Sequence, residues 1–97
     1  MDTSPPKVID CPSDIYKTVE TGTSYITVWW STPLATDFSE TFTTRSHEPG
    51  DSFRVGVTSV MYHFEDEFSN RAQCNFTVYV DTGKHYYIGE MLSWLFN

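Results

Sequence analysis

The stretch from Thr58 to Val80 constrains the fold of this chain most, because it contains two runs of alternating apolar and polar residues. Alternation with a period of two is typical of strands that have one buried and one exposed face. The residues between the two runs, DEFSN at 66–70, include short polar side chains that hydrogen-bond to nearby backbone in turns. The stretch therefore predicts a β-hairpin.

The same alternation predicts which side chains are buried. Residues 25–31 alternate in the same way as the hairpin and form a further predicted strand. The predicted core consists of Ile26, Val28, Trp30, Val60, Tyr62, Phe64, Phe76 and Val78, with Cys74 and Val80 on the same face of the hairpin. The side chains predicted to point outward include Tyr25, Trp29, Met61, His63, Asn75, Thr77 and Tyr79.

Turn signals rich in glycine and proline divide the rest of the chain into short strands. Phe42 is the expected core anchor of a Thr-rich strand, and Gly56 is expected to end the strand before the hairpin. The further predicted strands are residues 7–10, 15–19, 40–45 and 52–55, with residues 32–37 as a connection. About seven short strands, with no helical pattern before residue 84, predict an all-β protein built as an antiparallel β-sandwich.

The two ends of the chain differ in composition from the predicted sandwich at residues 7–83. Residues 1–6 contain two consecutive prolines and read as a linker. In the apolar tail, residues 84–97, Ile88, Met91, Leu92 and Leu95 lie at helical spacing and predict a short amphipathic helix, too short to span a bilayer. The tail is expected to be a helix docked on the sandwich, the start of a following segment, or an appended segment.

The net charge of −7 argues against partners that bind through basic residues. Nucleic acids and anionic membrane surfaces are bound through excess Lys and Arg, and the six basic residues here are scattered. Residues 1–10 lack the basic and then apolar pattern of a signal peptide. If the chain is extracellular, it is expected to be an excerpt of a longer secreted or membrane-anchored protein.

Two cysteines, Cys11 and Cys74, lie far apart and show no CxxC or Cys/His spacing, so a zinc site has little support. A disulfide is the favoured interpretation, and closing so long a loop would stabilise the fold by roughly 4 kcal/mol. Two reduced, buried thiols in a cytosolic protein are the alternative.

Several of these residues together resemble the hyalin repeat (HYR) domain over Lys7 to Val80. The resemblance rests on the sets Cys11-Pro12-Ser13-Asp14-Ile15; Val28-Trp29-Trp30 with Pro33, Ala35, Asp37 and Ser39; Pro49-Gly50-Asp51-Ser52-Phe53 with Val55-Gly56; and Val60, Tyr62, Asp66, Asn70, Cys74, Phe76, Val78 and Val80. Ser69 departs from the family's usual glycine, and Phe64 departs from its usual small residue.

The resemblance implies an immunoglobulin-like β-sandwich related to fibronectin type III modules, in extracellular multidomain proteins linked to cell adhesion. It also implies that Cys11 pairs with Cys74. Such a bond is expected to tie the first strand to the last across the two layers. The implied partners are other extracellular proteins and the neighbouring domains of a larger polypeptide.

Three kinds of binding or modification site are predicted. Asn75-Phe76-Thr77 is an N-glycosylation sequon, and the alternation places Asn75 outward. Calcium is a possible cofactor, because loop residues supply the oxygen ligands that it prefers: Asp14, Asp37, Asp51, Asp66, Glu67 and Asn70. Asp37, Asp66 and Asn70 are the weak ligand candidates. Turn-forming roles are the favoured interpretation of all six side chains. Tyr25, Trp29 and Tyr79 are the interface candidates.

Catalysis has little support in the sequence. His47, His63 and His85 are dispersed, and no serine lies in a Gly-x-Ser-x-Gly elbow. Two functions of different classes therefore remain. The first is a non-enzymatic adhesion or spacer module, and the second is a calcium- or carbohydrate-binding module that uses acidic loops or exposed aromatic residues.

Overall fold

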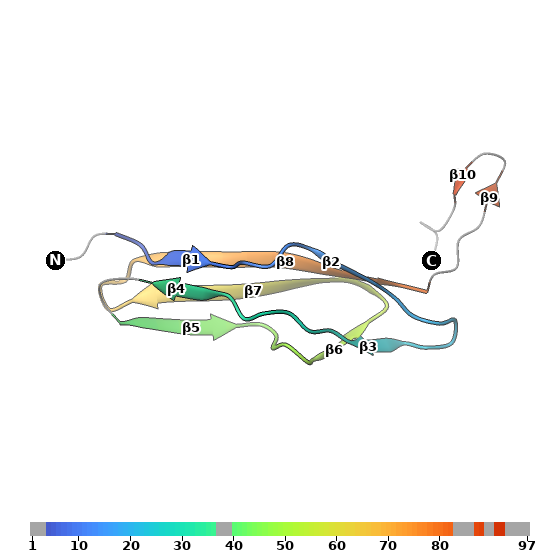
Figure 1. Ribbon diagram of the computed structural model, residues 1–97, viewed down its shortest axis with the longest axis horizontal. Helices are drawn as coiled ribbons and strands as arrows, with labels where there is room; N and C mark the ends of the chain where they lie inside the picture. Colours follow the sequence, from blue (N-terminus) through green and yellow to red (C-terminus); the bar gives the residue numbers. More distant parts are fainter. Residues whose placement is uncertain (1–3, 37–39, 83–86, 89–90, 93–97) are drawn as a thin grey trace.

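The computed structural model describes residues 4–36, 40–82, 87–88 and 91–92, and every regular element in them is a strand (Figure 1). The strands are β1 (Lys7–Ile9), β2 (Ile15–Thr18), β3 (Tyr25–Thr27), β4 (Leu34–Thr36), β5 (Thr41–Arg45), β6 (Ser52–Arg54), β7 (Gly56–Asp66), β8 (Arg71–Asp81), β9 (Tyr87–Ile88) and β10 (Met91–Leu92). The predicted all-β class is confirmed.

The predicted hairpin forms the centre of the larger sheet. β7 and β8 pair antiparallel from Gly56 opposite Val80 to Glu65 opposite Arg71, and the sheet order is β2-β8-β7-β5. Gly56 begins β7 instead of ending the preceding strand, so the hairpin is longer than predicted. Its alternation is confirmed, because inward and outward residues differ in burial from Thr58 onward in β7 and all along β8.

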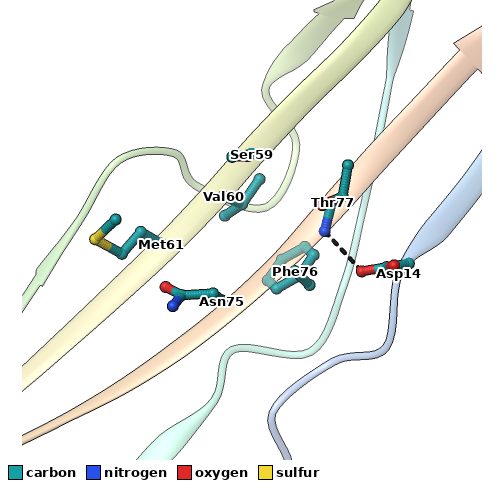
Figure 2. Close-up of a pocket in the computed structure, with 7 residues that line it drawn as sticks. All are labelled: Asp14, Ser59, Val60, Met61, Asn75, Phe76 and Thr77. Atoms are coloured by element: carbon teal, nitrogen blue, oxygen red, sulfur yellow. Dashed lines mark hydrogen bonds between the residues drawn. The ribbon is translucent and has the colours of Figure 1, made fainter.

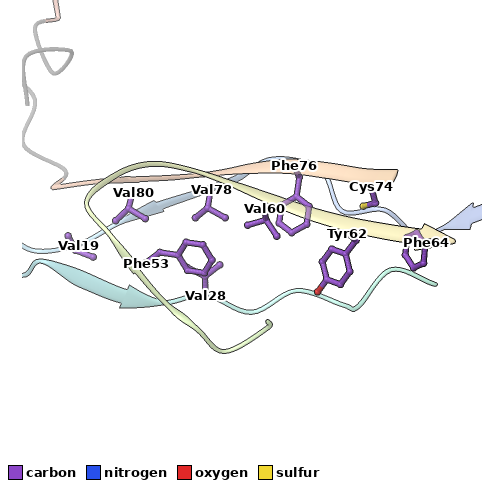
Figure 3. Packing of buried hydrophobic residues seen from close by; sticks show 10 residues of the cluster. All are labelled: Val19, Val28, Phe53, Val60, Tyr62, Phe64, Cys74, Phe76, Val78 and Val80. Atoms are coloured by element: carbon purple, nitrogen blue, oxygen red, sulfur yellow. The ribbon is translucent and has the colours of Figure 1, made fainter. Parts of the chain in front are cut away.

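Two shorter strand pairs, β1-β4 and β3-β6, make up the second layer. β4 corrects the prediction of a connection at residues 32–37, because Leu34–Thr36 pairs antiparallel with Lys7–Ile9 of β1. The predicted strand at 25–31 is regular only over Tyr25–Thr27. Apolar side chains from both layers meet between them to form the core (Figure 3).

The core matches the predicted set closely. Val28, Val60, Tyr62, Phe64, Phe76 and Val78 are buried, while Ile26 and Trp30 are partly buried against them. Phe53, Val19, Cys74 and Val80 complete the cluster. The Trp30 ring packs edge-on against Phe53 and Phe76, and its Nε1–H donates a hydrogen bond of 2.8 Å to Tyr62 Oη. The indole donor is thereby satisfied at the edge of a dry core.

Cys11 and Cys74 form the predicted disulfide, with their Cα atoms 5.6 Å apart. β2 pairs with β8 in parallel, Ile15 opposite Val78, and the same offset carried back along the chain places Cys11 opposite Cys74. The bond therefore does not span the two layers as expected. It joins neighbouring segments at the point where the chain leaves β1 in one layer and enters β2 in the other. This parallel pair is an exception to the predicted antiparallel arrangement.

Two further predictions are corrected. Phe42 lies opposite Glu65 on the outer face of the sheet and is 57% exposed, so it does not anchor the core. In the tail, Tyr87–Ile88 and Met91–Leu92 are antiparallel strands instead of turns of a helix, and the rest of that segment lies outside the described residues. No helix of membrane-spanning length and apolarity occurs in the described part of the chain.

Candidate functional surfaces

A shallow depression lies on the outer face of the larger sheet, beside the sequon. It has a volume of about 280 Å³ and is lined by Asp14, Ser59, Val60, Met61, Asn75, Phe76 and Thr77 (Figure 2). Asn75 is exposed, as the alternation predicted, and lies directly across from Met61 of β7. The Asn75 Nδ2 group donates to Gln73 Oε1 at 3.1 Å.

The sequon backbone is held on both sides in the folded chain. On one side, Asn75 and Thr77 are paired in register with Met61 and Ser59 of β7. On the other side, the Thr77 backbone N–H donates to Asp14 Oδ1 at 2.9 Å. Asp14 precedes β2 directly, so this contact joins the start of the edge strand β2 to the central strand β8.

The three interface candidates do not form one surface. Tyr79 is half-buried on the outer face of the larger sheet and stacks on Tyr16, with ring centroids 4.8 Å apart. Tyr25 and Trp29 are 53% and 71% exposed and belong to the other layer. Tyr25 lies under the Arg54 guanidinium, whose Cζ is 5.9 Å from the ring centroid. Tyr16, 72% exposed, was missed by the sequence analysis because its partner in the stack is fixed only by the β2–β8 register.

One edge of the exposed Trp29 ring covers Gly50. The turn that contains Gly50 is held against the residue before Trp29, because the Gly50 N–H donates to the Val28 carbonyl at 2.8 Å. Gly50 has a φ of +95°, and a Cβ placed there would lie 2.8 Å from Trp29 Cη2. Both the backbone conformation and the ring contact therefore favour glycine.

We expect Gly50→Ala to destabilise the domain by about 1–2 kcal/mol, because alanine disfavours a positive φ and its methyl group displaces the Trp29 ring. Urea unfolding followed by tryptophan fluorescence measures the change. The same substitution in a Trp29→Ala background should cost less, since only the backbone term remains. An equal cost in both backgrounds would show that the ring contact contributes nothing.

Asp14, Asp51 and Asp66, three of the candidate calcium ligands, accept hydrogen bonds from the backbone. Asp51 Oδ2 accepts from the Glu48 N–H, and Asp14 accepts from Thr77. Asp66 is 2% exposed and accepts from the backbone N–H groups of Phe68 and Asn70 and from Asn70 Nδ2. The contacts of Asp51 and Asp66 are local and favour turn-forming roles, whereas Asp14 joins two distant segments. Asp37 lies outside the described residues.

The turn held by Asp66 contains one of the departures from the HYR pattern, and its geometry explains the family's usual glycine. Ser69 has a φ of 68°, a conformation that glycine adopts without steric cost. Phe64, the other departure, is 1% exposed and lies opposite Ala72 in β8. The large Phe64 ring thus lies beside a small residue on the neighbouring strand.

His47 follows β5 and His63 lies in β7, so the two histidines in the described part of the chain belong to different elements. The His47 ring lies beside Phe53, and its Nδ1 is 2.8 Å from Ser46 Oγ, which accepts the Met61 backbone N–H. His63 is half-buried on the outer face, opposite Gln73. His85 lies outside the described residues. Among the described side chains, no three His, Cys, Asp or Glu residues gather as a metal site requires.

Comparison with known proteins identifies the family. The HYR domain family model matches residues 1–80, which include the disulfide, both layers and the sequon. The chain belongs to the HYR domain family. Over 81 residues this HYR domain is 47% identical to Hyalin from Strongylocentrotus purpuratus, and over 83 residues it is 46% identical to Hyalin from Lytechinus variegatus.

The two alignments cover 80% and 84% of this chain but only 7% and 16% of the two Hyalin proteins. The chain therefore spans a small fraction of the length of the curated relatives it matches. No solved structure gives a significant match. The resemblance read from the sequence is confirmed, and the structure adds the parallel β2–β8 pairing and the position of the disulfide within the HYR fold.

Proposed function

We propose that this HYR domain is a non-enzymatic extracellular module that acts in adhesion or protein–protein interaction as a disulfide-stapled spacer within a larger protein. Family membership supports the class of function, and the much greater length of the two Hyalin relatives supports a place in a longer polypeptide. A disulfide in a small domain is typical of extracellular proteins. Fold alone does not fix the partner.

The proposed spacer role rests on the position of the disulfide. β1 begins at one end of the sandwich and β8 ends at the other (Figure 1). Tension applied between these ends passes from Cys11 through the bond to Cys74 and then along β8. The residues between the two cysteines, which are 63 positions apart, are excluded from the tensioned path. The domain then transmits force at nearly constant length.

Single-molecule stretching between residues 7 and 81 tests the spacer function. We expect the oxidised domain to lengthen only slightly when it unfolds, because the loop between the cysteines stays closed. After reduction, unfolding should release about 220 Å more chain, from 63 positions at roughly 3.5 Å each. The Cys11→Ala variant should behave like the reduced chain. The same length gain in oxidised and reduced samples would contradict the proposal.

The chemistry of the partner is tested separately. The exposed rings of Tyr25 and Trp29 can contact a protein, and aromatic rings also stack on sugars, which is the alternative of a carbohydrate-binding module. Binding of the oxidised chain to a glycan array would favour that alternative. Attachment of cells to surfaces coated with the chain, without binding to the array, favours a protein partner.

A further inference from the structure

We propose that Asn75 carries an N-linked glycan that is attached before β8 joins the sheet and that afterwards covers the depression beside it. The Asn75 side chain is exposed on the outer face, and Thr77, which completes the sequon, lies on the same face two positions along the strand. The other asparagine in the described strands and turns, Asn70, is followed by Arg71-Ala72 and is not a sequon.

Glycan transfer to Asn75 requires an oligosaccharide linked to a lipid diphosphate as the donor. Cells with a secretory pathway supply this donor. The bond between sugar C1 and the diphosphate oxygen breaks, and a bond between C1 and Asn75 Nδ2 forms. The lipid diphosphate is the leaving group, and one amide proton passes to a base. No oxidation or reduction takes part.

The strand pairing fixes the order of events. A transferase must bind the sequon segment in its own active site, but in the folded domain both edges of this strand are occupied. Met61 and Ser59 of β7 pair with the sequon on one side, and the Asp14 carboxylate accepts the Thr77 N–H on the other. Because β8 lies in the middle of the sheet, freeing it requires unfolding most of the domain. The Cys11–Cys74 bond, one residue before Asn75, fastens the Asp14 segment beside it.

A glycan at this position occupies the outer face around Met61, which is 45% exposed. The depression beside Asn75 gives the first sugar a place against the sheet. Tyr25 and Trp29 lie on the other layer and stay uncovered, so the glycan leaves them free for a partner.

Occupancy is tested by secreting the full chain from animal cells behind a cleavable leader and measuring its mass before and after peptide-N-glycosidase. We expect a mass loss for the wild type and for Thr77→Ser, and none for Asn75→Gln or Thr77→Ala. Digestion of the wild type in 18O-water should place a labelled aspartate at position 75, which needs no variant. An unchanged wild-type mass would overturn the proposal.

The order of events is tested with unglycosylated protein and solubilised microsomes that supply the donor. The assay compares the oxidised chain with Cys11→Ser, which leaves the sequon intact, at a temperature where only the variant is unfolded. We expect transfer to Asn75 to be about tenfold or more faster in the unfolded variant, because access otherwise requires opening of the sheet. Equal transfer rates would show that the glycan can be added to the folded domain. Neither test depends on the spacer function.

Discussion

Replacing Cys74 with alanine is expected to lower the free energy of unfolding by about 4 kcal/mol, within the roughly 2–5 kcal/mol typical of small disulfide-bonded domains. The bond closes a loop of 63 positions in a chain of 97 residues, so without the bond most of the unfolded chain is unconstrained. A loss of this size is comparable to the total stability of many small domains. Urea unfolding followed by tryptophan fluorescence measures the change.

Cys11→Ala is the matched control, because Cys11 is exposed and Cys74 is 1% exposed. Cys11→Ala removes the bond alone, whereas Cys74→Ala also removes a buried sulfur from the core. The wild type in reductant should therefore match Cys11→Ala, and Cys74→Ala should be less stable than both. A wild type whose stability does not change in reductant would contradict the role of the bond.

The hairpin was predictable because its alternation is local and long, and because each strand has one clearly apolar face. The strand at residues 40–45 was predicted, but its orientation was wrong. In TFTTR the threonines are only partly apolar, so alternation cannot decide which face is buried. The pairing with β7 decides it, and Phe42 lies opposite Glu65 on the outer face. The β2–β8 register, and with it the place of the disulfide, depends on contacts between distant segments.

In the candidate sites too, features set by local alternation were predictable and contacts between distant segments were not. Burial of Cys74 and Phe76 made the outward position of Asn75 predictable by parity alone. The contact between Asp14 and Thr77 was not predictable, because it joins a loop to a strand across most of the chain. Exposure of Trp29 was predicted correctly, but its contact with Gly50 depends on how the turn at residues 47–51 folds back onto Val28.

Replacing Asp66 with alanine is expected to destabilise the domain by about 3 kcal/mol, because hydrogen bonds to a charged acceptor contribute roughly 1.5–3 kcal/mol each and are not additive. Asp66 Oδ1 accepts the backbone N–H groups of Phe68 and Asn70, both at 2.9 Å, and Oδ2 accepts Asn70 Nδ2 at 2.8 Å. These contacts close the turn between the two longest strands. Their loss leaves both amide groups without this acceptor at the end of the central hairpin.

Asp66→Asn should cost less than Asp66→Ala, since an amide oxygen can still accept the two backbone N–H groups. Glu67→Ala, at the exposed neighbouring position, should change the unfolding free energy by less than about 0.5 kcal/mol. All three variants are compared by urea unfolding with calcium and with a chelator. If Asp66 holds the turn through hydrogen bonds, its replacement costs the same in both conditions. A cost that appears only with calcium would instead identify Asp66 as a ligand, because an ion bound only to the folded state would then supply the lost stability.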